Sequence, residues 1–239
     1  MPPRPPASIG AKSSAGSRPA VPIRPAGRRP AGAAVRTLET ARRLATEYPV
    51  AECALVHTSA LELLVATILS AQCTDQRVNM VTPHLFARYP TVGDLAGAKV
   101  DEMEKIVQST GFFRSKTKAI REMAQDVVGR YSGEVPDTME ELVTLRGVGR
   151  KTANVVLGVA FGKPGLPVDT HVTRLVGRLK LSAHMDPVNI ESDICSMLPP
   201  PEWTNFSLRL IAHGRLVCGA RKPLCSRCLL NDICPSSQV

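Results

Sequence analysis

The most informative segment of the sequence is LVTLRGVGRKTANVV, residues 142–156. Its apolar pattern predicts a helix that ends near Leu145 and a second helix that begins near Arg150. Between them, Gly147 and Gly149 permit a tight turn, because glycine adopts positive φ and lets another backbone approach closely. The first N–H groups of the second helix lack partners within that helix, so they suit a phosphate. The segment therefore predicts a phosphate-binding helical hairpin, and the plainer alternative is an ordinary helix hairpin.

Helical periodicity continues on both sides of this hairpin. One helix is indicated from about residue 35 to just before Pro49, and the segment 61–69 is apolar nearly all round, as in a helix buried at the centre of a bundle. Alternating strand patterns are nearly absent, and short Gly, Pro and Asp stretches separate the helices. Further helices are expected near residues 74–88, 100–109, 115–131, 137–145, 150–161, 171–180, 187–198 and 203–215. The predicted fold class is therefore all-α.

The composition excludes several classes of protein. With 239 residues, of which 44% are hydrophobic, the chain is long enough for one large or two small domains. It has no run of eighteen apolar residues and no apolar segment at the N-terminus, so we expect neither a membrane protein nor a secreted one. The expected location is the cytoplasm of a bacterial type of cell. In that reducing compartment, the seven cysteines are expected as metal ligands, catalytic groups or small core residues and not as disulfides.

The net charge of +9 is concentrated at the N-terminus. The first 36 residues hold seven of the 30 Lys and Arg residues and no acidic residue, and they are rich in Pro, Ala, Gly and Ser. Such a segment buries too little apolar surface to offset chain ordering, so residues 1–35 are predicted to be a disordered basic tail. A cationic arm attracts DNA without sequence specificity. The alternatives are a solubilising extension, a misassigned start codon and an organellar transit peptide.

Four of the cysteines lie close together near the C-terminus, in the pattern C-x6-C-x2-C-x5-C. They are Cys218, Cys225, Cys228 and Cys234. Four thiolates at this spacing suit either a tetrahedral metal site or an iron–sulfur cluster. A zinc ribbon usually presents two close cysteine pairs, whereas only Cys225 and Cys228 form one here. The other three cysteines, Cys53, Cys73 and Cys195, have no partner at ligand spacing and are predicted to be small apolar residues.

Two further residues carry reactive groups. Lys151 lies in the first turn of the second hairpin helix, where the positive end of the helix dipole disfavours an ammonium and so favours a nucleophilic amine. Partial burial of the side chain would act in the same direction. Asp169 lies in PVDTHV, residues 167–172, at the start of the next predicted helix. Taken alone, the two residues are better explained as an exposed helix lysine and an N-capping aspartate.

The hairpin resembles the helix-hairpin-helix motif, and its context resembles the endonuclease III family of base-excision DNA glycosylases. The family pattern LPGVGRKTA is matched by residues 145–153, except that Arg146 stands in place of the proline. The resemblance extends from about residue 36 to the C-terminus and leaves only the tail outside.

The resemblance implies two helical domains with a DNA-binding cleft between them. Residues 53–163 would form a six-helix barrel that contains the hairpin, and residues 36–52 would pack with 164–239 as a cluster domain. The four C-terminal cysteines match the family's 4Fe-4S loop, which implies a 4Fe-4S cluster as the cofactor. The implied partner is damaged double-stranded DNA, with no membrane partner, and the protein is expected to be a monomer.

The implied activity is that of a bifunctional DNA glycosylase and AP lyase, which excises oxidised pyrimidines from duplex DNA in base excision repair. Lys151 would attack C1′ of an extruded nucleotide, form a Schiff base and allow β-elimination. Asp169 would accept the lysine proton or stabilise the positive charge that develops on the sugar.

The same resemblance implies several contacts with DNA. Gln72, in LSAQCTDQRVN at residues 69–79, would enter the space left by the flipped nucleotide, and Phe112, in GFFRSK at 111–116, would wedge between bases. The plainer interpretations are a helix end for Gln72 and a core side chain for Phe112. The remaining candidates for contacts with the DNA backbone are Gly147, Gly149, Arg221, Lys222, Lys116 and Lys118.

Three other functions remain possible at this stage. An adenine-specific relative would lack the nucleophilic lysine and add a C-terminal domain, whereas this sequence ends five residues after Cys234. A relative specific for oxidised guanine would keep the lysine and normally lacks the cluster. A non-catalytic DNA-binding or redox-sensing iron–sulfur protein would keep the hairpin and the cysteines without needing Lys151 and Asp169.

Overall fold

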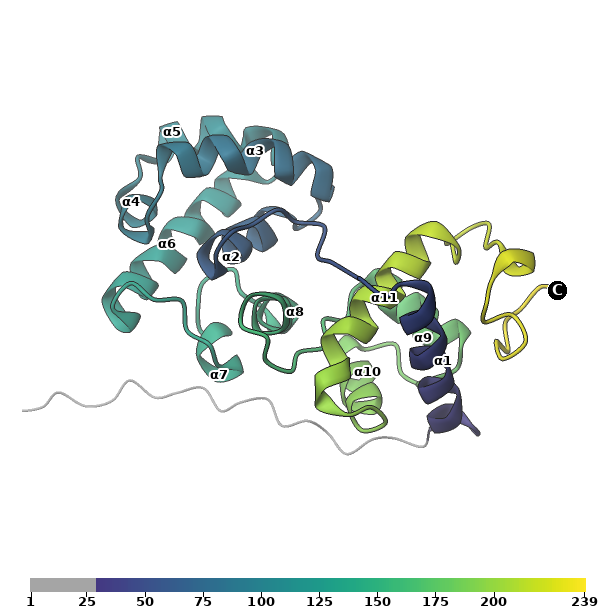
Figure 1. Ribbon diagram of the computed structural model, residues 1–239. Coiled ribbons are helices and arrows are strands. Elements are labelled where there is room, and N and C mark those ends of the chain that lie inside the picture. The colour runs from purple at the N-terminus through teal and green to yellow at the C-terminus, as the bar shows by residue number, and fades with distance from the viewer. Residues whose placement is uncertain (1–28) are drawn as a thin grey trace, which may run out of the picture.

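The computed structural model describes residues 29–239, which fold into two helical lobes (Figure 1). No strand occurs in this part of the chain, which confirms the prediction of an all-α fold. Most of the predicted basic tail lies outside the described residues. Helix α1 begins at Ala33, so the last three residues of the predicted tail are helical instead. Between residues 29 and 239, no helix is both long and apolar enough to cross a membrane.

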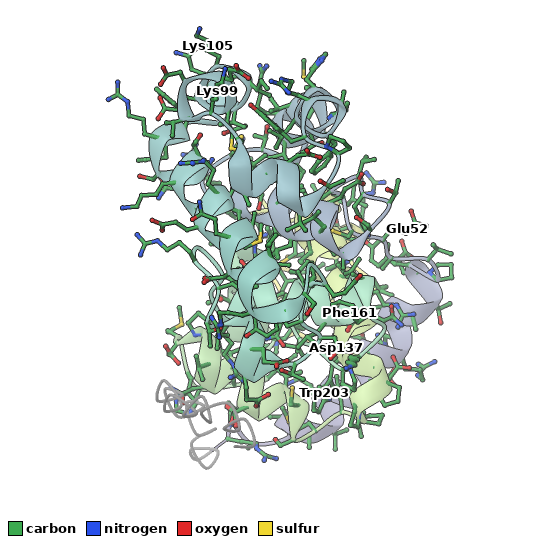
Figure 2. The ribbon with its side chains drawn as sticks, turned by 90° about the vertical axis from the view of Figure 1, so that its left-hand side faces the viewer. Glu52, Lys99, Lys105, Asp137, Phe161 and Trp203 are labelled. Carbon is green, nitrogen blue, oxygen red and sulfur yellow. The ribbon has the colours of Figure 1, made fainter. Side chains whose placement is uncertain are left out.

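The first lobe, which we call the barrel lobe, is built around the helix that the sequence predicts to be buried. The whole segment 63–69 of this helix is buried, and Ser59 caps its start by accepting a hydrogen bond from the N–H of Glu62. The helices of the lobe are α2 (Ala60–Leu69), α3 (Asp75–Arg88), α4 (Val92–Gly97), α5 (Val100–Val107), α6 (Phe113–Tyr131) and α7 (Met139–Leu142), with the short 3-10 helix η1 (Gln108–Thr110). Figure 2 shows Lys99 and Lys105 at the outer end of this lobe, around α5.

Helix α4 was not predicted from the sequence. Its six residues are too few to show helical periodicity, and only one of them, Leu95, is buried. The signal that marks it is a capping box, in which Thr91 and Asp94 each bind the backbone N–H of the other.

The predicted hairpin is present, although its first helix is shorter than expected. Helix α7 ends at Leu142, and after a turn α8 (Arg150–Val155) begins and continues into one π-helical turn, η2 (Val156–Ala160). Gly147 has φ +78°, and a Cβ atom there would lie 2.9 Å from the Cβ of Ala119 on α6. The turn therefore needs glycine at this position for both its backbone conformation and its packing. Arg146, which replaces the proline of the family pattern, is exposed and pairs with Glu122 of α6 at 3.4 Å.

The second lobe, which we call the C-terminal lobe, has its own hydrophobic core. Its helices are α1 (Ala33–Glu47), α9 (Thr170–Arg178), α10 (Pro187–Cys195) and α11 (Trp203–Leu216), with the short 3-10 helices η3 (Pro200–Glu202) and η4 (Cys225–Arg227). Leu44 of α1 is fully buried with Phe206 and Leu210 of α11. Arg43 of α1 binds Asp232 near the C-terminus. The N-terminal helix thus packs with the C-terminal third of the chain (Figure 1), away from the helix that follows it in the sequence.

The turn glycines allow a matched test of the hairpin. We expect Gly147→Ala to lower the free energy of unfolding by about 2 kcal/mol, because alanine would be strained at positive φ and would collide with Ala119. Gly149 has φ −93° and open space around its Cα, so Gly149→Ala should change the stability by less than about 0.5 kcal/mol. Urea unfolding of both variants measures the difference. Equal effects would contradict this description of the turn.

Candidate active site and nucleic-acid interface

Lys151 is presented to solvent at the start of α8. Its side chain is exposed and makes no hydrogen bond or ion pair with the described part of the chain. The partial burial expected from the sequence is therefore wrong for this structure. The N-cap of this helix is Gly149, which has no side chain, so the N–H groups of the first turn have no capping oxygen from it. Lys151 thus stands beside an uncapped, electropositive helix start.

Asp169 is the N-cap of α9, as the plainer interpretation predicted. Its Oδ1 accepts a hydrogen bond of 2.8 Å from the backbone N–H of Val172. The carboxylate is half-buried, and among the described residues its Oδ2 has no hydrogen-bonding partner. The cap therefore fixes the carboxylate through one oxygen and leaves the other available.

The chain segments that carry these two residues are in contact. Gly165 lies so close to α8 that a Cβ atom there would be 2.6 Å from the carbonyl oxygen of Asn154. Asn154 follows Lys151 by about one helical turn, and Gly165 precedes Asp169 by four residues. The contact therefore joins α8 to the segment that leads to Asp169.

Helix α11 holds the same segment from its other side. The hydroxyl of Thr204 donates a hydrogen bond of 2.8 Å to the carbonyl of Gly165, and the hydroxyl of Ser207 donates one of 2.5 Å to the carbonyl of Pro167. Residues 165–168 are all buried. This extended segment is thus enclosed between α8 and α11, and it leads directly to Asp169.

Two ion pairs join the lobes near these residues. Arg150 makes a bidentate contact with Glu191 of α10, with both N···O distances at 2.8 Å, and Glu191 is buried. Arg215 of α11 pairs with Asp75 of α3 at 2.6 Å. Both pairs connect residues far apart in the sequence, and no sequence pattern indicated either of them.

The thiol of Cys53 is affected by the charge of Lys151 and by those of the Asp75–Arg215 pair. Burial raises the pKa of the Cys53 thiol, with smaller effects from the charges of Asp75, Lys151 and Arg215. Cys53 lies in the segment that connects α1 with α2, so Lys151 and the Asp75–Arg215 pair both lie near this connection between the lobes.

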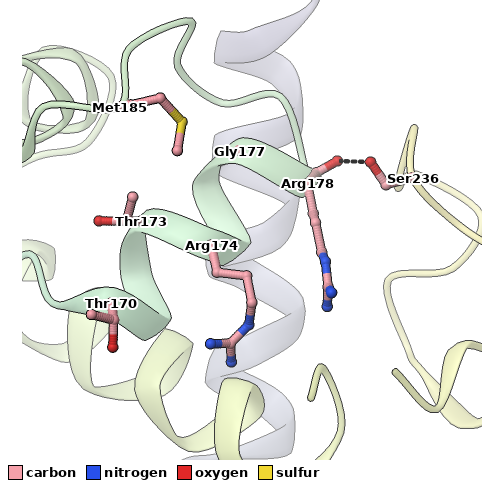
Figure 3. Close-up of a pocket in the computed structure, with 7 residues that line it drawn as sticks. All are labelled: Thr170, Thr173, Arg174, Gly177, Arg178, Met185 and Ser236. Carbon is pink, nitrogen blue, oxygen red and sulfur yellow. Dashed lines mark hydrogen bonds between the residues drawn. The ribbon is translucent and has the colours of Figure 1, made fainter. Parts of the chain in front are cut away.

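Two open hollows lie on the surface of the described chain, and neither includes Lys151 or Asp169. One, of about 710 Å³, lies beside the Asp75–Arg215 pair and includes Cys73 and Met80. The other, of about 530 Å³, follows α9 from Thr170 to the C-terminal segment at Ser236 (Figure 3). The structure thus brings the chain segments of Lys151 and Asp169 together without placing both side chains in either hollow.

Two arginines of the hollow on α9 hold the loop that follows α11. Arg178 donates hydrogen bonds to the carbonyls of Gly219 and Ala220, at 2.8 and 2.7 Å, and Arg174 binds the carbonyl of Cys218. In Figure 3 both guanidinium groups point away from α9. The next two residues in the loop, Arg221 and Lys222, are exposed and have no ion-pair partner within residues 29–239. The loop is therefore fixed by hydrogen bonds from these arginines to its backbone carbonyls, and it presents two positive charges that are free of ion pairs within the described residues.

Gln72 and Phe112 are both exposed at turns of the barrel lobe. Phe112 is 65% exposed, which contradicts the interpretation of this side chain as core, whereas its neighbour Phe113 packs against the core. Gln72 has φ +52° and Phe112 has φ +46°, a left-handed conformation that is uncommon for residues other than glycine. Such conformations persist where the surrounding structure holds them, and they are frequent at functional sites.

Lys116 is not available for a phosphate contact, contrary to the prediction from sequence. Its side chain is 4% exposed, and its ammonium donates hydrogen bonds to two backbone carbonyls. Lys118, two residues further along α6, is exposed and pairs loosely with Glu122 at 3.8 Å. Spacing alone could not distinguish the two lysines, because residues two apart on a helix point in different directions.

The four C-terminal cysteines line one small, partly open cavity of about 30 Å³. Two side chains approach their sulfur atoms: Arg178 donates to the Sγ of Cys218 at 3.1 Å, and His213 Nε2 lies 3.3 Å from the Sγ of Cys228. Within residues 29–239, no group of three or more His, Cys, Asp or Glu side chains is arranged to hold a single metal ion.

His213 is a neutral group in this arrangement. Its side chain is buried, and burial lowers the pKa of the imidazole to about 4. Nδ1 lies 3.1 Å from the hydroxyl of Tyr48. With that hydroxyl as donor to Nδ1, Nε2 carries the proton and donates to the sulfur of Cys228.

The other three cysteines are partly buried and pack against apolar residues, which agrees with the prediction that they are small apolar residues. Cys53 and Cys73 pack against the core of the barrel lobe, and Cys195 packs against that of the C-terminal lobe. Burial, with a further effect of Glu191, raises the pKa of Cys195 to about 12, which keeps its thiol protonated.

Comparison with known proteins agrees with this arrangement. Residues 65–200 match the model of the HhH-GPD superfamily base excision DNA repair protein. The chain is 55% identical to endonuclease III of Synechocystis, over 80% of this chain and 88% of the relative, and 43% identical to that of Bacillus subtilis, over the same shares. Among solved structures, a non-covalent endonuclease III–DNA complex has a TM-score of 0.81 and 40% identity, and it covers 85% of this chain and 95% of the other.

The fold and the hairpin thus define a helix-hairpin-helix protein of base excision DNA repair. Within that class, the chain belongs to the endonuclease III family. It is a DNA glycosylase and AP lyase, and the endonuclease III family acts on oxidised pyrimidines.

Proposed function

We propose that Lys151 is the nucleophile of this glycosylase and lyase and that Asp169 is its proton acceptor. The observation that supports the proposal is the contact between α8, which carries the amine, and the segment of the C-terminal lobe that leads to the carboxylate of Asp169. Lys151 is exposed and unpaired among the described residues, and Asp169 keeps one oxygen free. A solved structure similar to this chain is titled a trapped endonuclease III–DNA covalent intermediate, which supports a covalent mechanism.

The reaction begins with an extruded nucleotide, because C1′ cannot be reached inside the base stack. The amine of Lys151 forms a bond to C1′, and the bond from C1′ to the base breaks, so the base leaves with its electron pair. Asp169 takes the proton that the lysine nitrogen releases, and the sugar ring opens to a Schiff base. Loss of a proton from C2′ then breaks the bond between C3′ and its oxygen, which cuts the strand 3′ to the lesion.

The contacts with DNA that we propose come from exposed parts of both lobes. Gln72 enters the space of the extruded nucleotide and Phe112 wedges between bases, and their exposure at turns supports these roles. The backbone at Gly147 and Gly149 binds a phosphate through the uncapped start of α8. Arg221 and Lys222 meet the DNA backbone, supported by their free charges on a fixed loop.

We propose that Cys218, Cys225, Cys228 and Cys234 hold a 4Fe-4S cluster. Four cysteines that line one cavity supply the donor set of such a cluster, and the N–H donors of Arg178 and His213 suit thiolate sulfur. When bound, the cluster joins the C-terminal segment to α9 and α11 and takes no part in the steps at the sugar. Zinc is the alternative metal.

The proposed domain division rests on the hydrophobic cores, and the proposed cellular location rests on the sources of the relatives. The two separate hydrophobic cores support a barrel domain at 53–163 and a second domain formed by 36–52 with 164–239. The bacterial sources of the relatives support action on DNA in the cytoplasm. That the protein is a monomer remains a prediction.

The role of Lys151 is tested by trapping the covalent intermediate. Lys151→Ala should abolish borohydride trapping on a duplex that carries an oxidised pyrimidine, because the Schiff base cannot form. The control is Lys99→Ala, at an exposed lysine on the outer end of the barrel lobe (Figure 2), which should trap as the unchanged protein does. Undiminished trapping by Lys151→Ala would remove Lys151 from the mechanism.

The two roles of Asp169 are separated by Asp169→Asn. Asparagine is also a good N-cap, so the bond to the N–H of Val172 and the melting temperature should be retained. The carboxylate is lost, and we expect the single-turnover rate of base release to fall by about a hundredfold to ten-thousandfold. A normal rate in a folded variant would show that Asp169 is only a cap.

The cofactor is tested by metal analysis of the purified protein. Iron and acid-labile sulfide should be present in equal amounts, and Cys225→Ser should lose both. Cys195→Ser is the matched control, because Cys195 lies outside the cysteine-lined cavity, and it should keep its iron. A colourless protein that contains zinc and no iron would contradict the proposed cluster.

A further inference from the structure

Lys116 occupies an unusual position for a lysine. It lies on α6 with only 4% of its surface exposed, and burial lowers the pKa of its ammonium. The Nζ atom donates hydrogen bonds of 2.8 Å to the carbonyl of Leu69 and of 2.7 Å to the carbonyl of Thr110. A buried cationic group costs free energy unless its donors are satisfied, so these two bonds are what permits Lys116 here.

The two acceptors lie directly before the two exposed turns. Leu69 is the last residue of α2, three positions before Gln72. Thr110 is the last residue of η1, two positions before Phe112. The final carbonyls of a helix lack partners within it, and the C-terminal end of a helix dipole favours a positive charge. One ammonium therefore satisfies the ends of two elements that are far apart in the sequence.

Both turns hold a residue in a costly backbone conformation. Within residues 29–239, positive φ outside glycine occurs at Gln72, Phe112, Ser132 and Lys180. Two of these four are thus the residues at the exposed turns that Lys116 joins. A side chain forced into the left-handed region needs surrounding contacts to keep it there, and Lys116 supplies one such contact beside each turn.

We propose that Lys116 is a positioning residue that holds Gln72 and Phe112 at a fixed separation, so that both side chains enter the duplex together. The proposal rests on the insertion roles given to these two residues above. Without the ammonium, both carbonyls lose their donor and the two turns move independently. Extrusion of a paired nucleotide, which needs both insertions at once, becomes slow. Reaction at a sugar that is already unpaired does not change, because the segments that carry Lys151 and Asp169 are held by other contacts.

The test compares two substrates with each variant. One is a duplex with a single ring-saturated pyrimidine paired with adenine, and the other is a single strand with an aldehydic abasic site, which needs no extrusion. The measured quantity is the ratio of the single-turnover rate on the duplex to the rate of borohydride trapping on the single strand. The variants are Lys116→Met, which keeps the length of the side chain, and Lys116→Arg, which keeps its donors.

The controls separate this proposal from the one on which it rests. The double variant Gln72→Ala, Phe112→Ala tests the insertion roles themselves. Lys105→Met, at an exposed lysine on α5 (Figure 2), tests the effect of removing a charge from the same lobe. Circular dichroism melting of each variant shows whether it is folded at the assay temperature.

We expect Lys116→Met to lower the ratio by about tenfold to a hundredfold, as the double alanine variant does. Lys116→Arg should recover part of the loss, and Lys105→Met should leave the ratio unchanged. An unchanged ratio for Lys116→Met beside a lowered ratio for the double variant would overturn the role of Lys116 alone. An unchanged ratio for the double variant would overturn the insertion roles and this proposal with them.

If Lys116→Met does not fold, the ratio of Lys116→Arg is compared with that of Lys116→Gln in the same way. If neither substitution changes the ratio, the proposal is wrong. Failure of every substitution at this position to fold would also overturn it, because Lys116 would then support the whole lobe and not the two turns.

Discussion

The relative placement of α8 and Asp169, which carry the proposed reactive groups, depends on one segment, residues 165–168, enclosed between α8 and α11. Gly165 touches the backbone of α8 so closely that no larger residue fits, and two hydroxyls of α11 bind the carbonyls of Gly165 and Pro167. The barrel lobe contributes the amine and the C-terminal lobe the carboxylate, so neither lobe alone has both groups. The buried pair of Arg150 and Glu191 adds a directional contact beside this segment. A buried ion pair adds little net stability, but its geometry favours one relative arrangement of the elements that it joins.

Within the barrel lobe, the buried ammonium of Lys116 joins two separate elements, because it binds the carbonyls of Leu69 and Thr110. The exposed turns at Gln72 and Phe112 each follow a residue whose carbonyl Lys116 binds. A side chain that inserts into a base stack must be held in position, because it separates the bases only if it is correctly placed between them. The C-terminal lobe fixes the loop that we propose to face DNA in a similar way, by the bonds from Arg178 to the carbonyls before Arg221.

The sequence predicted the helical class, most of the helices and the hairpin, because these depend on local periodicity and on glycine. It also indicated Lys151, Asp169 and the four cysteines as candidate site residues, because the hairpin and the cysteine spacing match those of a known family. It missed α4, which is too short for periodicity, and it placed Lys116 at the surface although its ammonium is enclosed. The pairs of Arg215 with Asp75 and of Arg150 with Glu191 were beyond reach, because each joins residues that only the packing of the two lobes brings together. Local patterns reveal elements and motifs, while contacts between lobes depend on the tertiary structure.

The assignment of the nucleophile can be checked without altering the protein. The unchanged enzyme is reduced with borohydride on a lesion-bearing duplex, digested with nuclease and protease, and the lysine that carries the sugar remnant is located by tandem mass spectrometry. The arrangement of α8 and the segment 165–168 predicts the remnant on Lys151 and on no other amine. A remnant on another lysine, such as Lys163, or on the N-terminal amine would show that the groups brought together at this junction are not those that react.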